Sequence, residues 1–507
     1  MSRKDIVLVA INARYTHTSF GLRYLYANLH ALRKDAEIQE FVIKNDPSEM
    51  AERILAQKPK IVAIGVYIWN ACDVRDLIEI IRTVSPQTKI VLGGPDVSHK
   101  PFRINWQHAD YIVQGEGEVT FYELCRAILQ GEPPKERILS AKMPQLKTVE
   151  LSYRYYSDHD IQNRYIYVEA SRGCPFECEF CLSAIDERVR TFEMDKLLEA
   201  FETLWQKGAR NFKFIDRTFN LNIKLANRLL DFFLAKEEHY TLHFEVVPDN
   251  FPERLKERIK RFPPGSLQFE IGIQTLNPQI LENINRRMDL QKVRENIAFL
   301  EKETHAHLHL DLIIGLPGES VESFAENLNR LKAMTDSEIQ IGILKKLSGT
   351  TLDRHDTQYG MRYSQKPPYE ILQNDLISFE RLQKLKRFSR FWDLTYNSGN
   401  FQGTIHYLWQ KQSVYDGFYA FSEWIYSQTE STWQISLMRL SELLFRYLTE
   451  VLGYDPQEIA DKMIADIIKI RGRRIPGILQ EHASHIPNLK RMQLQKHQKR
   501  QILRAST

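Results

Sequence analysis

Three of the five cysteines in this chain stand within eight positions, at Cys174, Cys178 and Cys181. They are spaced C-x3-C-x2-C inside the stretch SRGCPFECEFC (171–181). A cysteine thiolate is a soft, strongly donating ligand that suits zinc, copper(I) and iron–sulfur clusters. The spacing therefore predicts a metal or cluster site with three protein ligands.

Two other interpretations of these cysteines are weaker. Cys178 and Cys181 alone form C-x-x-C, but a redox C-x-x-C normally opens a helix in a thioredoxin-like unit, whereas this one opens a loop in a larger repeat. A structural zinc site needs a fourth protein ligand. Cys72 and Cys125 fall in predicted helices of another domain, where we expect both to be small buried hydrophobic side chains.

An iron–sulfur cluster with three cysteine ligands leaves one iron open, whereas clusters that only transfer electrons normally have four. An open metal position is a place for substrate or cofactor. The motif, in a loop after the first strand of a β/α series, resembles the signature of the radical S-adenosylmethionine (SAM) enzymes. That resemblance implies a [4Fe-4S] cluster held by Cys174, Cys178 and Cys181, with SAM on the open iron and its reductive cleavage to a 5′-deoxyadenosyl radical.

The first 132 residues alternate continuous apolar segments with amphipathic ones, which predicts a parallel sheet covered on both faces. We expect an α/β, five-stranded, flavodoxin-like doubly wound (Rossmann-like) domain. Its strands are predicted at 5–13, 37–43, 60–69, 89–94 and 110–115, and its helices at 21–33, around 49–57, at 73–84 and at 119–129. Residues 133–163 carry Pro133, Pro134 and Pro144 and are predicted to be a linker.

A second α/β series occupies residues 164–350. Six β/α units in this length predict a partial (β/α)6 TIM barrel, in which chemistry occurs at the carboxyl ends of the strands. The strands are predicted at 164–170, 211–216, 242–247, 266–274, 307–315 and 338–346, with helices such as 194–206 and 225–235.

The strand pattern stops after about residue 350. Residues 351–470 are predicted to form a mainly helical, aromatic-rich C-terminal domain, whose aromatics serve as core or as a lid over the barrel mouth. Residues 471–507 form a basic tail, since residues 469–507 hold ten Lys or Arg against one acid. Such a tail contacts nucleic acid or is simply a solvated terminus, and we favour the second.

The radical SAM resemblance also implies residues that contact SAM. Phe180 would pack near the cluster and adenine, and strand-end residues would hold the rest of the cofactor. Those residues are Asp216, Arg217 and Asn220 for the methionine end, Glu270, Gly272 and Gln274 for ribose and carboxylate, and Gly315 for adenine. Ordinary turn chemistry at the barrel rim is the alternative, although buried acids such as Asp216 and Glu270 are costly without partners. No literal GGE follows the second strand, and Arg188 and Arg190 face either the SAM carboxylate or the surface.

The N-terminal domain resembles the cobalamin (B12)-binding domains that precede radical SAM barrels. The resemblance implies that a glycine-rich turn admits the nucleotide tail of cobalamin and that the tail passes between strands. The residues concerned are Gly93, Gly94 and Ser98 in the turn, Gly65 and Tyr67 between the strands, and Gly115 and Glu116 near the linker. The loop after the first strand lacks the D-x-H-x-x-G pattern of cobalt-ligating histidines, so we expect His17 to be bonded locally, which does not exclude cobalamin. A nicotinamide G-x-G-x-x-G is absent there.

Together the resemblances imply a cobalamin-dependent radical SAM methyltransferase that acts on an unactivated carbon of a small-molecule or macromolecular substrate. A cobalamin-assisted rearrangement, cyclisation or reduction is the alternative. A non-catalytic cobalamin carrier or sensor is disfavoured, because a structural cluster needs no open iron. An electron donor such as flavodoxin or ferredoxin is implied. Clustered cysteines without a disulfide framework predict a cytoplasmic protein, and no apolar run approaches the roughly 20 residues that would span a membrane.

Overall fold

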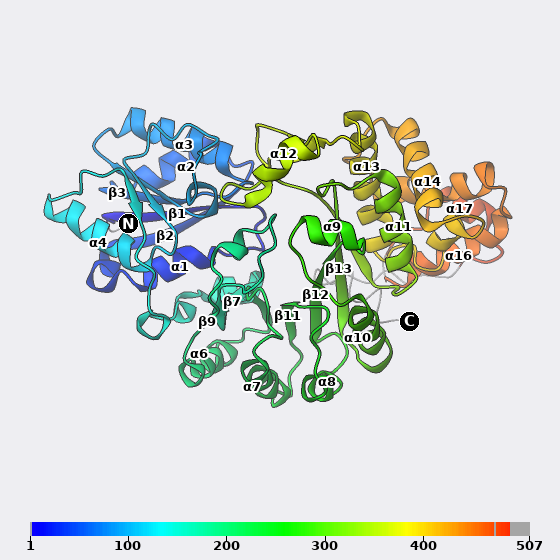
Figure 1. The fold of residues 1–507 in the computed structure, drawn as a ribbon, viewed down its shortest axis with the longest axis horizontal. Helices are drawn as coiled ribbons and strands as arrows, with labels where there is room; N and C mark the ends of the chain where they lie inside the picture. The colour runs from blue at the N-terminus through cyan, green and yellow to red at the C-terminus, as the bar shows by residue number, and fades with distance from the viewer. Residues whose placement is uncertain (1–2, 471–472, 487–507) are drawn as a thin grey trace. The chain divides into compact units, whose positions relative to one another are not determined.

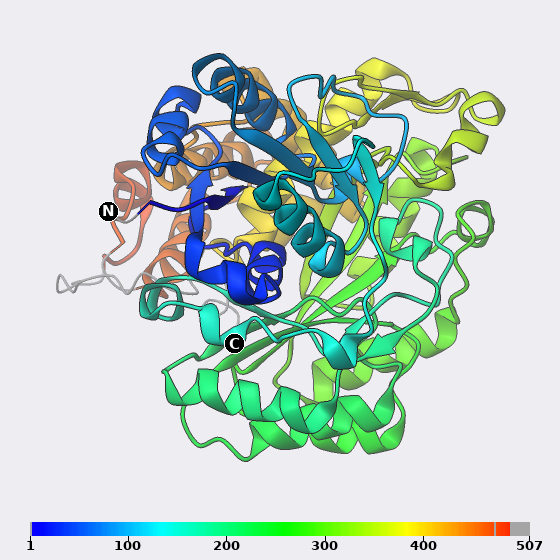
Figure 2. The same cartoon turned by 90° about the vertical axis from the view of Figure 1, so that its left-hand side faces the viewer.

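The computed structural model describes residues 3–470 and 473–486 of the chain, shown in two views in Figures 1 and 2. These residues form two compact units. The first unit contains residues 1–245, 345–354 and 363–370, and the second contains residues 246–344, 355–362 and 371–507. Each unit is described by itself below.

The first unit begins with a six-stranded parallel sheet in the order β2-β1-β3-β4-β5-β6. Its strands are β1 (Ile6–Asn12), β2 (Ala36–Val42), β3 (Ile61–Gly65), β4 (Lys89–Gly93), β5 (Tyr111–Gln114) and β6 (Ile138–Ser140). The flavodoxin-like order of the first five strands confirms the predicted fold. The prediction of five strands is wrong by one, because β6 lies in the expected linker, where three residues are too few to show a period.

Helices cover both faces of this sheet (Figure 1). They are α1 (Phe20–Ala27), α2 (Pro47–Leu55), α3 (Ala71–Val84) and α4 (Glu118–Gln130). Val7 and Val9 of β1 share a core cluster with residues of α2 and α3, whereas Ile6 and Leu8 share one with residues of α1 and α4. Alternate residues of one strand thus enter two cores, which is the doubly wound arrangement.

Three sequence predictions in this domain need correction. The strand expected over 60–69 ends at Gly65. The helix expected over 21–33 ends as an α-helix at Ala27, and a 3-10 helix (His30–Asp35) follows it. Cys72 is exposed on α3, so the expectation that it is a buried hydrophobic side chain is wrong, whereas Cys125 is buried in α4 as expected. A predicted helix does not by itself show which of its faces meets the sheet.

The second α/β series supplies six more parallel strands. In the first unit β7 (Ile166–Val168), β10 (Asn211–Phe214) and β11 (Thr241–Val246) pair in parallel. In the second unit β12 (Leu267–Gln274), β13 (His307–Ile314) and β14 (Glu338–Ile343) do the same. The intervening helices are α6 (Met194–Gln206), α7 (Ile223–Leu234), α8 (Glu253–Ile259), α9 (Pro278–Asn283), α10 (Leu290–Glu303) and α11 (Val321–Lys332). These six strands and their helices confirm the predicted (β/α)6 series.

The C-terminal part is mainly helical, as predicted. Its helices are α13 (Phe379–Trp392), α14 (Val414–Thr429), α15 (Leu437–Arg446), α16 (Pro456–Ile468) and α17 (Gly477–His482). Strands do not stop at residue 350, since the short β15 (Arg362–Tyr363) and β16 (Ile371–Gln373) follow. Trp392 is fully buried and donates its Nε1 proton to the Ile339 carbonyl at 3.0 Å, so this aromatic packs as core.

Most of the predicted basic tail, residues 471–472 and 487–507, lies outside the described residues. Among the residues that the structure describes, no helix is both long enough and apolar enough to cross a bilayer.

Candidate functional site

The first unit contains a cavity of 710 Å³ at the carboxyl ends of the first sheet. The residues after β1, β3, β4 and β5 line it, and residues around β7 and the end of β10 complete the wall. Seven residues singled out in the sequence are brought together here: His17, Gly65, Tyr67, Gly93, Gly94, Gly115 and Glu116. A switch point at the carboxyl ends of a doubly wound sheet is the usual place for a ligand.

Gly94 is the tightest backbone position at the cavity. Its φ is +104°, and a Cβ there would lie 2.6 Å from the Val66 carbonyl oxygen, so only glycine fits without a shift of backbone. Ser98 does not line the cavity but bridges two of its loops. Its Oγ donates to the Gly94 carbonyl at 2.9 Å and accepts from the Gly115 amide at 3.2 Å.

Aromatic side chains and one histidine form part of the wall. Tyr67 stacks on Trp69 with ring centroids 4.3 Å apart. His17 Nδ1 lies 2.5 Å from the Tyr167 hydroxyl, and burial, with Lys213 and Arg14 nearby, lowers the pKa of His17. The imidazole is therefore neutral at physiological pH, and its partner is Tyr167, 150 residues away in the chain, instead of a residue of its own loop as expected.

The cysteine motif lies on a loop whose two ends pair as a short antiparallel ladder, β8 (Ser171–Arg172) with β9 (Arg190–Thr191). Cys174 and Cys178 are buried and Cys181 is half-buried, and none of the three forms a disulfide. Burial raises the pKa of Cys174, and the nearby Cys178 and Cys181 thiols raise it further. Three thiols in one partly closed loop form a donor set that suits a soft metal or cluster.

Arg172 ties the start of this loop to the cavity. Its guanidinium lies 2.7 Å from Glu116, 2.7 Å from Glu118 and 2.8 Å from Glu169. All four side chains line the cavity. Burial raises the pKa of Glu169 to about 7, although Arg172 opposes the shift. Arg190, at the other end of the loop, also pairs with Glu116 and lies 2.9 Å from Asp186.

Sequence reasoning missed Glu118, Glu169 and Arg172. A signal for two of them was available in RYIYVEASRG (164–173), where the acid Glu169 and the base Arg172 follow an otherwise apolar strand. The same ion pairs show that Arg190 faces acids, whereas Arg188 is exposed.

Asp216 is buried just after the end of β10. There it anchors the loop that carries the three cysteines, residues 171–191, called the cluster loop below. Its carboxylate accepts from the Ala170 amide at 2.9 Å and from Ser171 Oγ at 2.6 Å. Burial raises the pKa of Asp216 to about 6, against the effect of these bonds. Two other residues predicted to contact SAM follow Asp216 closely in the sequence: Asn220 is fully buried, and the Arg217 guanidinium lies 2.9 Å from the Glu245 carboxylate. Phe180, in the cysteine motif, is half-buried.

In the second unit, Glu270, Gly272 and Gln274 alternate along the less buried face of β12. A register shift between Gly272 and Gln274 and a φ of +68° at Gln274 mark a bulge at the end of this strand. A left-handed non-glycine residue is uncommon and often stands at a functional site. The carbonyl of Gly272 accepts from Arg286, which sequence reasoning did not identify.

The loop after β13 begins with Gly315, whose φ is +88°. A Cβ there would lie 2.8 Å from a side-chain carbon of Ile371, so packing requires glycine at this position. The fully buried Glu319 accepts from the Gly315 amide at 2.9 Å. Burial raises the pKa of Glu319 to about 8, and the loop is thus organised around a protonated carboxyl at neutral pH.

Comparison with known families matches three stretches of the chain. Residues 6–125 match the B12 binding domain, and residues 168–331 match the radical SAM superfamily. Residues 357–506 match a family described as "Protein of unknown function (DUF4080)". The first two matches coincide with the sheet that carries the cavity and with the series that carries the cysteine loop.

Two curated relatives align over about two thirds of the chain. One is the uncharacterized methyltransferase PH0819 of Pyrococcus horikoshii, 26% identical over 66% of this chain and 78% of its own length. The other is the cobalamin-dependent radical SAM methyltransferase TokK of Streptomyces tokunonensis, 25% identical over 63% of this chain. The match spans about half of TokK, 52% of its length.

Solved structures share the fold at low identity. The radical SAM methyltransferase TsrM of Kitasatospora setae has a TM-score of 0.58 at 17% identity, covering 72% of this chain and 78% of its own. The cobalamin-dependent SAM radical enzyme OxsB has a TM-score of 0.59 at 12% identity, covering 92% of this chain and 79% of its own. Residues 168–331 thus resemble the radical SAM superfamily, and the stretch ahead of them, residues 6–125, resembles the B12 binding domain.

Proposed function

We propose that this protein is a cobalamin-dependent radical SAM methyltransferase that acts on an unactivated carbon. One observation carries the proposal: in the first unit, the B12 binding domain and the start of the cluster loop contribute to the wall of the same cavity. Arg172 lines that cavity, and Cys174 follows it by two residues. Two cofactors that act on one substrate need adjacent sites of this kind.

The cavity has the size and the mainly apolar wall of a ligand pocket. Its 710 Å³ falls within the usual range of ligand pockets, and aromatic and aliphatic side chains dominate its wall. Gly65, Gly93, Gly94 and Gly115 stand at the strand ends, where a glycine leaves the backbone accessible. These residues, with Tyr67 and Glu116, would hold cobalamin, and Ser98 would support the turn from behind through its bonds to Gly94 and Gly115.

The thiols of Cys174, Cys178 and Cys181 would hold a [4Fe-4S] cluster and leave one iron for SAM. When bound, the cluster with SAM supplies a carbon radical that removes hydrogen from substrate, and cobalamin supplies a methyl carrier. The chain's own contribution is placement: Arg172 holds the loop to the cavity wall, and Asp216 fixes its first residues.

Further contacts to SAM are proposed for Phe180, Asp216, Arg217 and Asn220 in the first unit. Glu270, Gly272, Gln274 and Gly315 are proposed for the second unit. The strained backbone at Gln274 and the buried Glu319 behind Gly315 support a shaped binding surface there.

A flavodoxin or ferredoxin is proposed as electron donor, in the cytoplasm. None of the five cysteines, which all lie among the described residues, forms a disulfide, and this supports a reducing compartment. The substrate is a small molecule or a macromolecule.

Product analysis tests the proposal. The protein, reconstituted anaerobically with iron, sulfide and cobalamin, is incubated with SAM and a low-potential reductant. Methyl transfer through cobalamin predicts both S-adenosylhomocysteine and 5′-deoxyadenosine. 5′-Deoxyadenosine alone would favour a rearrangement, cyclisation or reduction, and the absence of both products would contradict a radical SAM activity.

A further inference from the structure

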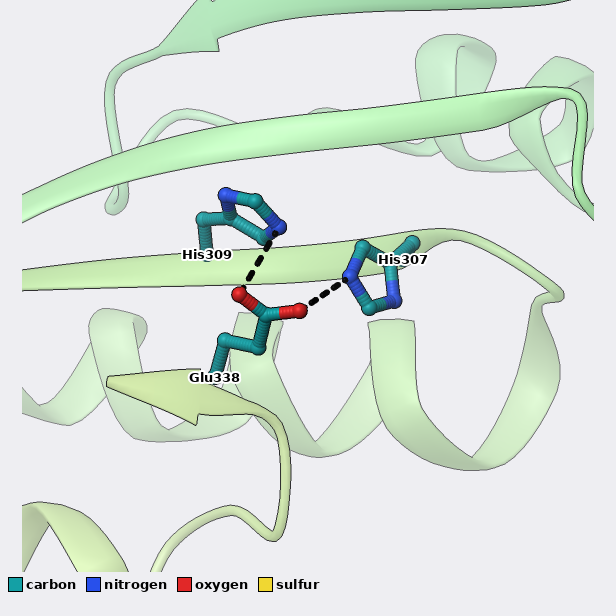
Figure 3. A group of neighbouring side chains, drawn as sticks. All are labelled: His307, His309 and Glu338. Atoms are coloured by element: carbon teal, nitrogen blue, oxygen red, sulfur yellow. Dashed lines mark hydrogen bonds and ion pairs between the residues drawn. The ribbon is translucent and has the colours of Figure 1, made fainter. Parts of the chain in front are cut away.

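Two histidines and a glutamate cluster at the start of β13 and β14 in the second unit (Figure 3). His307 and His309 stand two positions apart on β13 and therefore point to the same side of the strand. Glu338 is the first residue of β14 and aligns with His309 across the ladder. Figure 3 shows the carboxylate of Glu338 directed between the two rings.

Each histidine contacts a different oxygen of the carboxylate. His307 Nε2 lies 3.2 Å from Glu338 Oε1, and His309 Nε2 lies 3.4 Å from Glu338 Oε2. One ligand atom from each of the three residues lies within 4.8 Å of the ligand atoms of the other two. The Glu338 side chain is fully buried, and the two imidazoles are 12% and 14% exposed. A buried carboxylate needs a cation or a proton nearby, because burial disfavours an isolated charge.

We propose that His307, His309 and Glu338 bind a divalent transition-metal ion, with Zn²⁺ as the ion that the donor set fits best. Imidazole nitrogen and carboxylate oxygen are zinc ligands, and two histidines with one glutamate form a known three-ligand zinc set. The three ligand atoms converge from two adjacent strands, and water would complete the tetrahedron. Nothing in the proposed methyltransferase chemistry uses this cluster.

Neighbouring amides orient one of the rings. Gln340 Nε2 lies 2.8 Å from His309 Nδ1, and Gln268 Nε2 lies 3.2 Å from the same nitrogen. A ligating histidine usually has its second ring nitrogen bonded to a polar group, which sets the tautomer. With zinc on Nε2, the Nδ1 proton of His309 would be donated to the side-chain carbonyl of Gln340 after rotation of its amide.

The cluster lies at the opposite end of β13 from the loop that begins with Gly315. His307 and Glu338 begin their strands, whereas Gly315 and its loop follow the end of β13. Gly315 lies eight positions after His307, which in extended chain is a span of about 26 Å. In β/α barrels the chemistry occurs at the carboxyl ends, and the amino ends serve stability. The ion would therefore join β13 to β14 away from the reaction.

Zinc content and coordination test this site. The full-length protein with its cluster reconstituted, and the same chain with Cys174→Ala, Cys178→Ala and Cys181→Ala, are equilibrated with micromolar free Zn²⁺ and desalted. We expect one zinc per chain in both. X-ray absorption at the zinc edge should show only nitrogen and oxygen neighbours, at about 2.0–2.1 Å.

Variants assign the ligands. His307→Ala, His309→Ala and Glu338→Gln should each weaken zinc binding by at least about 100-fold, whereas His305→Ala, at an exposed position of the same segment, should leave it unchanged. Failure of the wild-type chain to retain zinc would overturn the proposal. So would sulfur neighbours near 2.3 Å, or full zinc content in Glu338→Gln. The wild-type absorption spectrum decides the matter even if a variant does not fold.

Discussion

Arg172 Nη1 lies 2.7 Å from Glu116 Oε2, so the residue at the start of the cluster loop is bonded to the loop that follows β5 of the first sheet. The same guanidinium also reaches Glu118 and Glu169. One cation therefore holds three acids from two parts of the first unit at the wall of the cavity.

Arg172→Met should destabilise the protein by about 3–5 kcal/mol, because it leaves three acids without their shared cation in a largely buried place. Urea denaturation measures the change. Arg188→Met, at an exposed position of the same segment, is the control and should change stability by less than about 0.5 kcal/mol. A loss below about 1 kcal/mol for Arg172→Met would show that the acids find other partners.

Each of Cys174→Ala, Cys178→Ala and Cys181→Ala should reduce iron from about four to less than one per chain after reconstitution and abolish SAM cleavage. Iron analysis and 5′-deoxyadenosine formation are the measurements. Cys72→Ala is the matched control, since Cys72 is exposed on α3 of the B12 binding domain. Full cleavage activity in any of the three variants would contradict the role of that cysteine.

Gly94→Ala should lower cobalamin binding by at least about tenfold, because the new Cβ must displace the backbone of Val66 at the cavity. Gly131→Ala separates this effect from backbone strain alone. Gly131 also has a positive φ, +82°, but no atom within 4 Å of its added Cβ. Cobalamin titration followed by visible absorption should therefore show normal binding for Gly131→Ala. Equal affinities for the two variants would count against the turn as part of the site.

Glu319 makes stability depend on pH. Its pKa is about 8 in the folded protein against 4.5 normally, so between these values the folded chain binds the extra proton. The free energy of unfolding should then fall as pH rises from 4.5 to 8, by up to about 1.4 kcal/mol per unit from this group. Glu319→Gln should show a shallower fall than wild type in urea denaturation between pH 5.5 and 8. Parallel profiles would refute the assignment.

The residues at the carboxyl ends of the first sheet could be predicted from the sequence, because the positions of most of its strands could be predicted. Continuous apolar segments placed β1, β4 and β5 closely, whereas the strand expected over 60–69 ends at Gly65. Gly94 and Gly115, the last residues of two predicted strands, marked the sheet edge at which both now line one cavity. The cysteine spacing needed no fold at all. These predictions rested on the spacing of the cysteines and on the pattern of apolar residues along the chain.

The partners of charged residues were not predictable in the same way. Asp216 attracted attention as a buried acid at a strand end, but its bonds to Ala170 and Ser171 depend on the register of β10 beside β7. Arg172 gathers acids from positions more than 50 residues away. Such contacts arise from tertiary packing, so the local sequence can mark the charged residues but not their distant partners.

Asp216 holds Ala170 and Ser171 through bonds that involve no metal. The start of the cluster loop is thus ordered by folding itself, which lowers the entropy that iron binding must remove. A loop start held in this way would keep its conformation in the apoprotein, so cluster insertion would not have to order it.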